Sequence, residues 1–200
     1  MPRKSPSLCS MIRKEYGSMA DVTFPQRHTP LAGISPDIAA LSVTPPQRRL
    51  TLHLRDTDRA CINGALGFAL PPALRAAVQG QRAALWMGPE ETLILSTEIN
   101  DLAPALEAAL KDVPHALVDV SHRQIGLLIE GARAVDALNT GCPLDLSEAA
   151  FPVGMCTRTL YHKADIVLWR LSSTQFHVEV WRSFAPYVWE LLDKARREAA

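Results

Sequence analysis

The segment 119–141 changes its apolar periodicity midway. Its first part has an apolar residue at every second position, which predicts a strand with one buried face over 125–130. Its second part repeats apolar residues at helical spacing, which predicts a short helix over 132–139. Gly141 and Pro143 end that helix, because glycine accepts a left-handed backbone and proline cannot continue a helix. A chain with both periodicities in one short segment must combine strands and helices around a shared core.

Strand and helix patterns alternate along the rest of the chain as well. Upstream they follow in the order strand, helix, strand, strand, helix, strand, which is typical of the split βαβ unit of ferredoxin-like domains. The upstream strands are predicted over 50–54, 82–87, 92–97 and 116–120, and the helices over 57–66 and 100–110. Downstream, strands are predicted over 155–162, 166–171 and 176–180. We therefore predict an α+β fold of two interlocked ferredoxin-like lobes, about 48–120 and 121–200, that share a mixed or antiparallel sheet.

A final amphipathic helix is predicted after Ser183, whose hydroxyl can cap its first turn. Its apolar residues fall on one face. They are Phe184, Tyr187, Val188, Leu191, Leu192 and Ala195.

The first 47 residues have a different composition from the rest. Prolines are frequent there and apolar residues show little periodicity, so we predict an extended N-terminal arm over 1–47 and an α+β domain over 48–200. Residues 1–18 are predicted to be disordered or to precede the true start of the protein, for which Met19 is the candidate. A long arm without its own core needs a surface to lie on, which is a first indication of a partner.

Composition and charge argue against several classes of protein. Basic and acidic residues number 21 each, so nothing electrostatic favours nucleic acid or an anionic membrane as a partner. No apolar run approaches the ~20 residues needed to span a bilayer. The amino-terminal segment also lacks the continuous apolar core of a secretory signal. Four scattered cysteines (Cys9, Cys61, Cys142 and Cys156) are typical of buried, reduced thiols, and the expected location is the cytoplasm.

The sequence shows no catalytic constellation. Asp119, Ser121 and His122 are the residue types of a hydrolase triad, but neighbours on a strand point to opposite faces, so we expect turn-forming or ion-pairing roles. The six histidines have no metal-ligand spacing, and the glycine motifs of nucleotide-binding loops are absent. We therefore predict no catalytic, cofactor-binding or metal-binding residue on this chain.

Tryptophan and arginine residues are the candidates for an interface, because these side chains anchor protein–protein contacts. Trp169 lies inside an apolar run and is expected in the core, whereas Trp181 follows polar residues on the more polar strand face. Arg123, Arg158 and Arg170 are expected either on a solvated surface or in buried or interfacial ion pairs. The predicted subunit interface consists of Arg123, Arg158, Trp181, Arg182 and Tyr187.

Five short motifs, taken in order, resemble the gamma subunit family of heterotetrameric sarcosine oxidase. They are Trp86-x-Gly88-Pro89-Glu90-Glu91, Val118-Asp119-Val120-Ser121-His122-Arg123, Gly141-Cys142-Pro143-Leu144-Asp145-Leu146, Phe151-Pro152-x-Gly154 and Arg182-Ser183-Phe184-Ala185-x-Tyr187. The resemblance spans about 25–195, which is nearly the whole chain except the arm.

The stretch that begins at Asp119 also resembles the folate-binding aminomethyltransferases of the glycine cleavage system, and this implies an aminomethyltransferase-like, folate-binding fold. In that wider family a Gly-Gly turn leads to an acidic pair that helps to position the substrate amine and folate. The corresponding turn in this chain, 162–165, has no glycine and keeps only Asp165 of the acidic pair. The resemblance therefore implies that the scaffold is kept without the transfer chemistry.

The family resemblance implies a non-catalytic structural subunit. The complex that it implies oxidatively demethylates sarcosine to glycine, passes the one-carbon unit to tetrahydrofolate and forms hydrogen peroxide. The implied partners are the alpha, beta and delta subunits, and FAD, FMN, NAD and tetrahydrofolate are expected on those larger subunits, with no cofactor on this chain.

Other functions remain open from the sequence. The chain can be the equivalent subunit of an N-methylglutamate or dimethylglycine dehydrogenase complex, since such a subunit would look much the same. It can also be a free-standing folate-binding or aminomethyltransferase-like protein. A third class, a small-molecule sensor or regulatory module, has no sequence feature in its favour.

Overall fold

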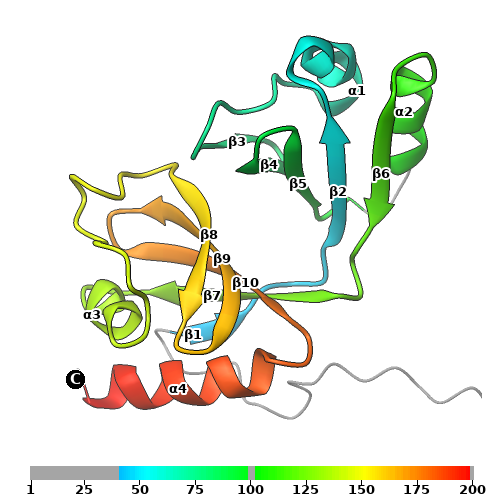
Figure 1. Ribbon diagram of the computed structural model, residues 1–200. Helices are drawn as coiled ribbons and strands as arrows, with labels where there is room; N and C mark the ends of the chain where they lie inside the picture. Colours follow the sequence, from blue (N-terminus) through cyan, green and yellow to red (C-terminus); the bar gives the residue numbers. More distant parts are fainter. Residues whose placement is uncertain (1–40, 99–101, 199–200) are drawn as a thin grey trace, which may run out of the picture.

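The computed structural model describes residues 41–98 and 102–198, and their strands form two five-stranded antiparallel sheets (Figure 1). The first sheet has the strand order β3 (Ala76–Gln79), β4 (Arg82–Gly88), β5 (Glu91–Ser96), β2 (Arg48–Leu54) and β6 (His115–Asp119). The second sheet has the order β8 (Cys156–Tyr161), β9 (Ala164–Ser172), β10 (Gln175–Trp181), β7 (Gln124–Glu130) and β1 (Leu41–Val43). The strand pairings of the described residues are antiparallel, which is the antiparallel alternative of the prediction. They form two separate sheets and not one sheet shared by the lobes.

The helices cover the outer face of each sheet. In the first lobe these are η2 (Asp56–Ile62), α1 (Asn63–Leu66) and α2 (Leu102–Leu110), which bury the outward-facing leucines of β2. In the second lobe α3 (Ala134–Asn139) and α4 (Ala185–Glu198) bury the outward-facing side chains of β7 and β10. The inner faces of the two sheets pack on each other through a third apolar cluster, which includes Leu85, Leu93, Cys156, Val167 and Trp169. The result is four layers, with helices outside and two sheets between them.

The two lobes repeat one topology, and the repeat is completed by a strand from elsewhere in the chain. Strands β2, β4, β5 and β6 have the spatial order of a ferredoxin-like unit, and β7, β9, β10 and β1 occupy the same places in the second sheet. In the first lobe the strand beyond the second helix is β6. In the second lobe that place is taken by β1, which precedes the whole first lobe. The interlocked arrangement predicted from the sequence thus has a specific cause. The strand β1 precedes the first lobe in the chain but completes the sheet of the second lobe.

Several local predictions differ from the structure in instructive ways. The predicted helix over 57–66 is a 3₁₀ helix followed by one α-helical turn, which ends at Gly67 with a left-handed φ of 95°. Strands β1 and β3 were not predicted, because each has too few residues to show a period. Residues 1–40 of the predicted arm lie outside the described residues, while 41–43 form β1. Phe184 and Tyr187, predicted on the same helix face as Val188 and Leu192, are exposed, whereas Val188 and Leu192 are buried.

Gly126 allows β1 and β10 to approach β7 closely. A Cβ at this position would lie 2.3 Å from Thr44 Oγ1, 3.0 Å from Glu179 Oε1 and 3.1 Å from His177 Cε1. Thr44 is tied to the Gly126 carbonyl by its amide and its hydroxyl, at 2.9 and 3.1 Å. The side chains of Glu179 and His177 are buried and bonded to each other. None of the three neighbours can therefore withdraw without losing a hydrogen bond.

We expect Gly126→Ala to lower the free energy of unfolding by about 1–3 kcal/mol, because overpacking forces these neighbours out of place. Urea unfolding followed by tryptophan fluorescence would measure it. Gly64→Ala is the matched control, since its Cβ would meet nothing within 4 Å and Gly64 lies in α1. Equal stability of the two variants would show that the close approach at Gly126 is unimportant.

Candidate functional site

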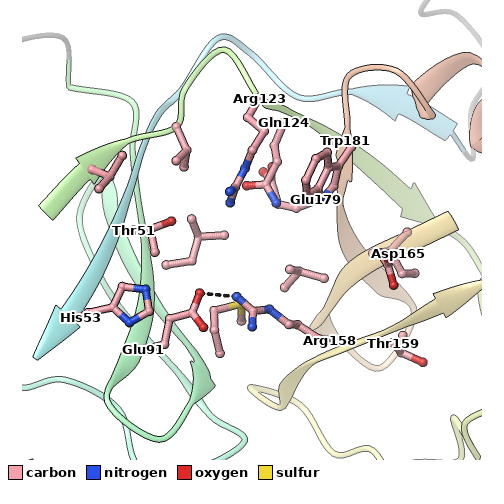
Figure 2. Close-up of a pocket in the computed structure, with 16 residues that line it drawn as sticks. Thr51, His53, Glu91, Arg123, Gln124, Arg158, Thr159, Asp165, Glu179 and Trp181 are labelled. Carbon is pink, nitrogen blue, oxygen red and sulfur yellow. Dashed lines mark hydrogen bonds and ion pairs between the residues drawn. The ribbon is translucent and has the colours of Figure 1, made fainter. Parts of the chain in front are cut away.

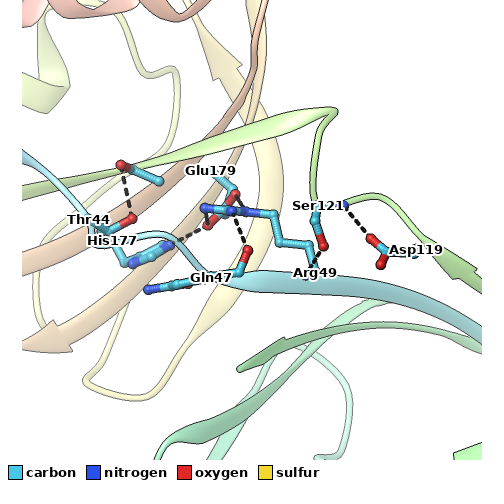
Figure 3. A network of polar contacts seen from close by, with 8 residues as sticks. Thr44, Gln47, Arg49, Asp119, Ser121, His177 and Glu179 are labelled. Carbon is cyan, nitrogen blue, oxygen red and sulfur yellow. Dashed lines mark hydrogen bonds and ion pairs between the residues drawn. The ribbon is translucent and has the colours of Figure 1, made fainter. Parts of the chain in front are cut away.

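A buried ion pair joins the two sheets (Figure 3). Arg49 on β2 donates from Nε to Glu179 Oε2 at 2.7 Å and from Nη2 to Glu179 Oε1 at 3.0 Å. His177 Nε2 lies 2.8 Å from the same Oε1 atom. The Glu179 side chain is fully buried, and those of Arg49 and His177 are each 5% exposed. We call Arg49, His177 and Glu179 the inter-sheet network.

The alternation of side chains along each strand places this network on the inner faces. On β2, Leu50 and its apolar neighbours point to the helices, so Arg49 points to the other sheet. On β10, Phe176 and Val178 point to α3 and α4, so His177 and Glu179 point inward. The sequence indicated a polar strand face at His177, Glu179 and Trp181, and the structure buries the first two of these side chains between the sheets. From the sequence alone, a charged side chain on an alternating strand is predicted to be exposed, because the local pattern does not reveal a partner on the other lobe.

The chain passes from the first sheet to the second through a turn that holds the Arg49 backbone. The Arg49 amide donates to Ser121 Oγ at 2.9 Å, and the Val120 amide donates to the Arg49 carbonyl at 2.8 Å. The Ser121 amide donates to an Asp119 carboxylate oxygen at 2.9 Å, and Arg48 pairs with the other oxygen at 3.8 Å. The predicted turn-forming and ion-pairing roles of Asp119 and Ser121 are therefore confirmed.

The sheets separate on one side of their shared core and leave a cavity of about 410 Å³ between them (Figure 2). Its apolar wall comes from both lobes and includes Met87, Leu93, Val118, Val120 and Ile166. Its polar wall contains Thr51, His53, Glu91, Arg123, Gln124, Arg158, Thr159, Asp165 and Glu179, with Trp181 beside them. A cavity of this size with an apolar wall and a few polar groups is typical of a small-molecule site.

The charged side chains around the cavity differ in how they are neutralised. Arg158 on β8 forms an ion pair with Glu91 on β5, which ties the lobes together at the rim. Glu179 is neutralised within the inter-sheet network. Arg123 lies with its guanidinium carbon 5.2 Å from the centre of the Trp181 ring, a cation–π contact, and points into the cavity. Among the described residues, Arg123 and Asp165 have no ion-pair partner.

The predicted interface residues lie near one another, but in different surroundings. Arg158 and Arg123 line the cavity, as does Trp181, which is 47% exposed. The amide of Arg182 donates to the Arg123 carbonyl at 2.8 Å. Tyr187, on the first turn of α4, is 37% exposed. The structure brings Arg123, Trp181 and Arg182 together at the end of β10 and the start of β7, with Arg158 across the cavity from them and Tyr187 apart on α4.

Two other predictions about single residues can be compared with the structure. Trp169 is buried in the core between the sheets, as predicted. Arg170 is buried but does not form the predicted ion pair within the described residues; it donates to the carbonyl oxygens of Leu146, Phe151, Ser172 and Ser173, and lies over the Phe176 ring. The guanidinium provides donors for carbonyl oxygens in two loops and at the end of β9.

The three cysteines of the described residues are free thiols, but they are not all buried. Cys142 and Cys156 lie in the core, and burial raises the pKa of the Cys156 thiol to about 12. Cys61 is exposed, which contradicts its predicted burial, and Cys9 falls outside the described residues.

Searches for two other kinds of site find no candidate in the described ranges 41–98 and 102–198. No group of three or more His, Cys, Asp or Glu residues there is arranged to hold a metal ion. No helix in this part of the chain has the length and apolar character that crossing a bilayer requires.

The fold identifies a class of protein. The chain superposes on aminomethyltransferase T of the glycine cleavage system from Bartonella henselae with a TM-score of 0.59 and 12% sequence identity, over 76% of this chain and 44% of that one. At this identity the similarity shows the fold alone. The two-sheet arrangement is that of the aminomethyltransferase, folate-binding fold, as predicted.

Closer similarities define the family. The family model described as sarcosine oxidase, gamma subunit family, matches residues 56–198. The sarcosine oxidase gamma subunits of Corynebacterium sp. strains P-1 and U-96 are 32% and 30% identical to this chain, over 70% and 71% of it and 70% of each relative. A chain of the heterotetrameric sarcosine oxidase from Corynebacterium sp. U-96, in complex with pyrrole 2-carboxylate, superposes with a TM-score of 0.74 and 28% identity, over 80% of this chain and 85% of that one. This chain belongs to the sarcosine oxidase gamma subunit family.

Removing the negative charge of Glu179 should strongly destabilise the protein. In Glu179→Gln the Arg49 guanidinium stays buried without a counter-charge, and we expect a loss of about 3–5 kcal/mol in the free energy of unfolding. The control is Lys194→Gln, in an ion pair with Glu198 whose side chains are 72% and 68% exposed, for which we expect less than about 0.5 kcal/mol. Urea unfolding curves give both values, and similar losses in the two variants would contradict the assigned role.

The network should also make stability depend on acid pH. Burial by itself would raise the pKa of Glu179, but the hydrogen bond from His177 and the charges of His177 and Arg49 outweigh it and lower the pKa below the ordinary 4.5. The folded state then binds fewer protons than the unfolded state, so this stabilisation is complete above pH 4.5 and is lost as the pH falls through the folded pKa. Unfolding midpoints measured between neutral and acid pH should fall more steeply for the unsubstituted chain than for Glu179→Gln.

Proposed function

We propose that this chain is a non-catalytic structural subunit of a heterotetrameric sarcosine oxidase complex, with the alpha, beta and delta subunits as its partners. Membership of the gamma subunit family over 56–198 carries the proposal. The superposition on a chain of such a heterotetramer supports it, because the match covers most of both chains.

The complex would oxidatively demethylate sarcosine to glycine in the cytoplasm, pass the one-carbon unit to tetrahydrofolate and form hydrogen peroxide. We assign FAD, FMN, NAD and tetrahydrofolate to the partner subunits. The side chains of this chain that look most reactive are already engaged in hydrogen bonds, which supports a non-catalytic role for this subunit. Both oxygens of Glu179 accept hydrogen bonds from the network, and Ser121 and Asp119 hold a turn.

The surface at the start of α4 supports contact with a partner. Trp181, Phe184 and Tyr187 follow one another at intervals of three residues and are 47%, 44% and 37% exposed. We call these three residues the aromatic patch. Aromatic side chains of this kind, with arginine beside them, are enriched at subunit contacts. We propose that the aromatic patch, with Arg123, Arg158 and Arg182, forms the subunit interface.

The domain limits belong to the same proposal. We propose an arm over 1–47 whose end forms β1 in the second sheet of this chain and whose remainder lies against a partner, with 1–18 as a disordered or mis-assigned start. The proposed domain covers 48–200, with lobes at about 48–120 and 121–200. The turn between β6 and β7 supports the lobe boundary, because it is where the chain leaves the first sheet.

The alternative of an equivalent subunit in an N-methylglutamate or dimethylglycine dehydrogenase complex differs in the methylated amine that the complex oxidises. A free-standing folate-binding or aminomethyltransferase-like protein would instead work without partners.

Isolation of the tagged chain from its native cell extract separates these cases. Large subunits and a flavin spectrum in the eluate support a subunit role, and oxidation of sarcosine by that eluate in preference to other methylated amines identifies the complex. A colourless single chain would overturn the proposal.

Charge introduced into the aromatic patch should weaken assembly. We expect Trp181→Asp to reduce the co-purified subunits at least about tenfold, because a carboxylate would be desolvated at the contact. Val78→Asp on the edge strand β3 is the matched control, since Val78 is 58% exposed and lies outside the aromatic patch. The yield of partner subunits per tagged chain measures the effect. Loss of partners from Val78→Asp and not from Trp181→Asp would place the interface elsewhere.

A further inference from the structure

We propose that the cavity between the two sheets is a binding site for a small N-acylated amino acid, a molecule with an amide N–H, a nearby carboxylate and an apolar acyl group. The inference goes beyond the proposed function, because it concerns only residues of this chain and needs no partner.

A buried acceptor without a partner is the first observation. Gln124, the first residue of β7, lines the cavity and is 7% exposed. Its Oε1 atom is buried and accepts no hydrogen bond within the described residues. Buried carbonyl oxygens are rarely left unpaired, since desolvation without a hydrogen bond is costly. A ligand that donates an N–H to this oxygen would satisfy it.

The adjacent Arg123 supplies a site for an anion. Its guanidinium points into the cavity and contacts only the Trp181 ring among the interactions of the described residues (Figure 2). A guanidinium can donate two parallel hydrogen bonds to a carboxylate. Because Arg123 and Gln124 are neighbours in the chain, a carboxylate and an N–H that are close together in one molecule would reach both.

The charges around the cavity favour a singly charged ligand. Arg158 is neutralised by Glu91, and Arg49 by Glu179, which leaves Arg123 as the one arginine of this cavity without a carboxylate among the described residues. A phosphate dianion would therefore face one free cation and the open carboxylate of Asp165. A carboxylate monoanion matches the single guanidinium.

The donor is better supplied by an amide than by an ammonium group. The nearby Glu179 carboxylate is neutralised by Arg49 and already accepts three hydrogen bonds from Arg49 and His177, so it attracts a second cation only weakly. The open carboxylate of Asp165 lies on β9, two strands away from Gln124 in the sheet. A neutral N–H loses less hydration than an ammonium when it reaches the buried Gln124 oxygen. The apolar wall, which includes Met87, Val118 and Val120, then accommodates the acyl group.

N-benzoylglycine is a direct probe, because it carries an aromatic acyl group, an amide N–H and a carboxylate. Titration of the full-length chain, alone and in the complex that co-purifies with it, can be followed by calorimetry and by the fluorescence of Trp181 in the cavity wall. Two analogues test the contacts separately. The methyl ester of N-benzoylglycine lacks the carboxylate, and N-benzoylsarcosine lacks the N–H. We expect each to bind at least about tenfold more weakly, the effect of one lost hydrogen bond to a buried or charged group.

Variants assign the binding to the two residues. Gln124→Met keeps the length of the side chain and removes the acceptor, and Arg123→Gln removes the charge at an exposed position. Each should raise the Kd of N-benzoylglycine at least about tenfold. In addition, Gln124→Met should no longer distinguish N-benzoylglycine from N-benzoylsarcosine. The control is Arg133→Gln, an arginine 63% exposed at the start of α3 that is not part of the cavity.

Unchanged affinity in both variants, or no saturable binding of N-benzoylglycine at millimolar concentrations, would overturn the inference. Recovery of partner subunits is a separate measurement, so a failure of the proposed function and a failure of this site are distinguishable. If Gln124→Met fails to fold, Arg123→Gln and the two analogues still decide the result.

Discussion

The Arg49–Glu179 ion pair is the interaction on which the relation between the two sheets depends. Each sheet has its own apolar core against its own helices, so either could in principle bury its outer face alone. The inner face of either sheet, in contrast, is buried only when the other sheet packs on it. Glu179 is fully buried, and a carboxylate without a counter-charge there would cost several kilocalories per mole. The charged pair therefore specifies how the sheets face each other, while the apolar cluster between them supplies much of the attraction.

The same arrangement accounts for the cavity. Bulky apolar side chains from β4, β5 and β9 fill the space between the sheets on one side. On the other side the inner face carries Thr51, Gln124 and Glu179, whose polar atoms must be satisfied and cannot simply be packed together. The rim is closed by a second ion pair, Arg158 with Glu91, which again has one partner on each lobe. Two ion pairs, each with one partner on each lobe, thus hold the lobes together beside the cavity.

The sequence predicts the parts of the structure that depend on neighbouring residues. The strand β7 and the helix α3 follow from the spacing of apolar residues over 125–139, and the order of elements leads to the ferredoxin-like topology. The burial of Glu179 could not be predicted, because its partner Arg49 lies 130 residues away and both residues look solvent-exposed in their own strands. The cavity has no local signal in the sequence, since its walls are eight strands and a turn that only the packed sheets bring together. The prediction of an interface at Trp181 and its arginine neighbours rests on residue type alone, because tryptophan and arginine often anchor protein contacts.

The position of β1 has a consequence for how the protein is made. Thr44 at the end of β1 bonds to Gly126, 82 residues later, so the strand is synthesised long before the sheet that receives it. The whole first lobe lies between them and can form its own sheet while the ribosome is still translating β7. During that interval β1 is a nascent strand without a sheet to join, and its pairing must wait for the rest of the second lobe. The order of synthesis therefore makes the closing of the second sheet a late step, in which an early segment of the chain returns to meet a newly made one.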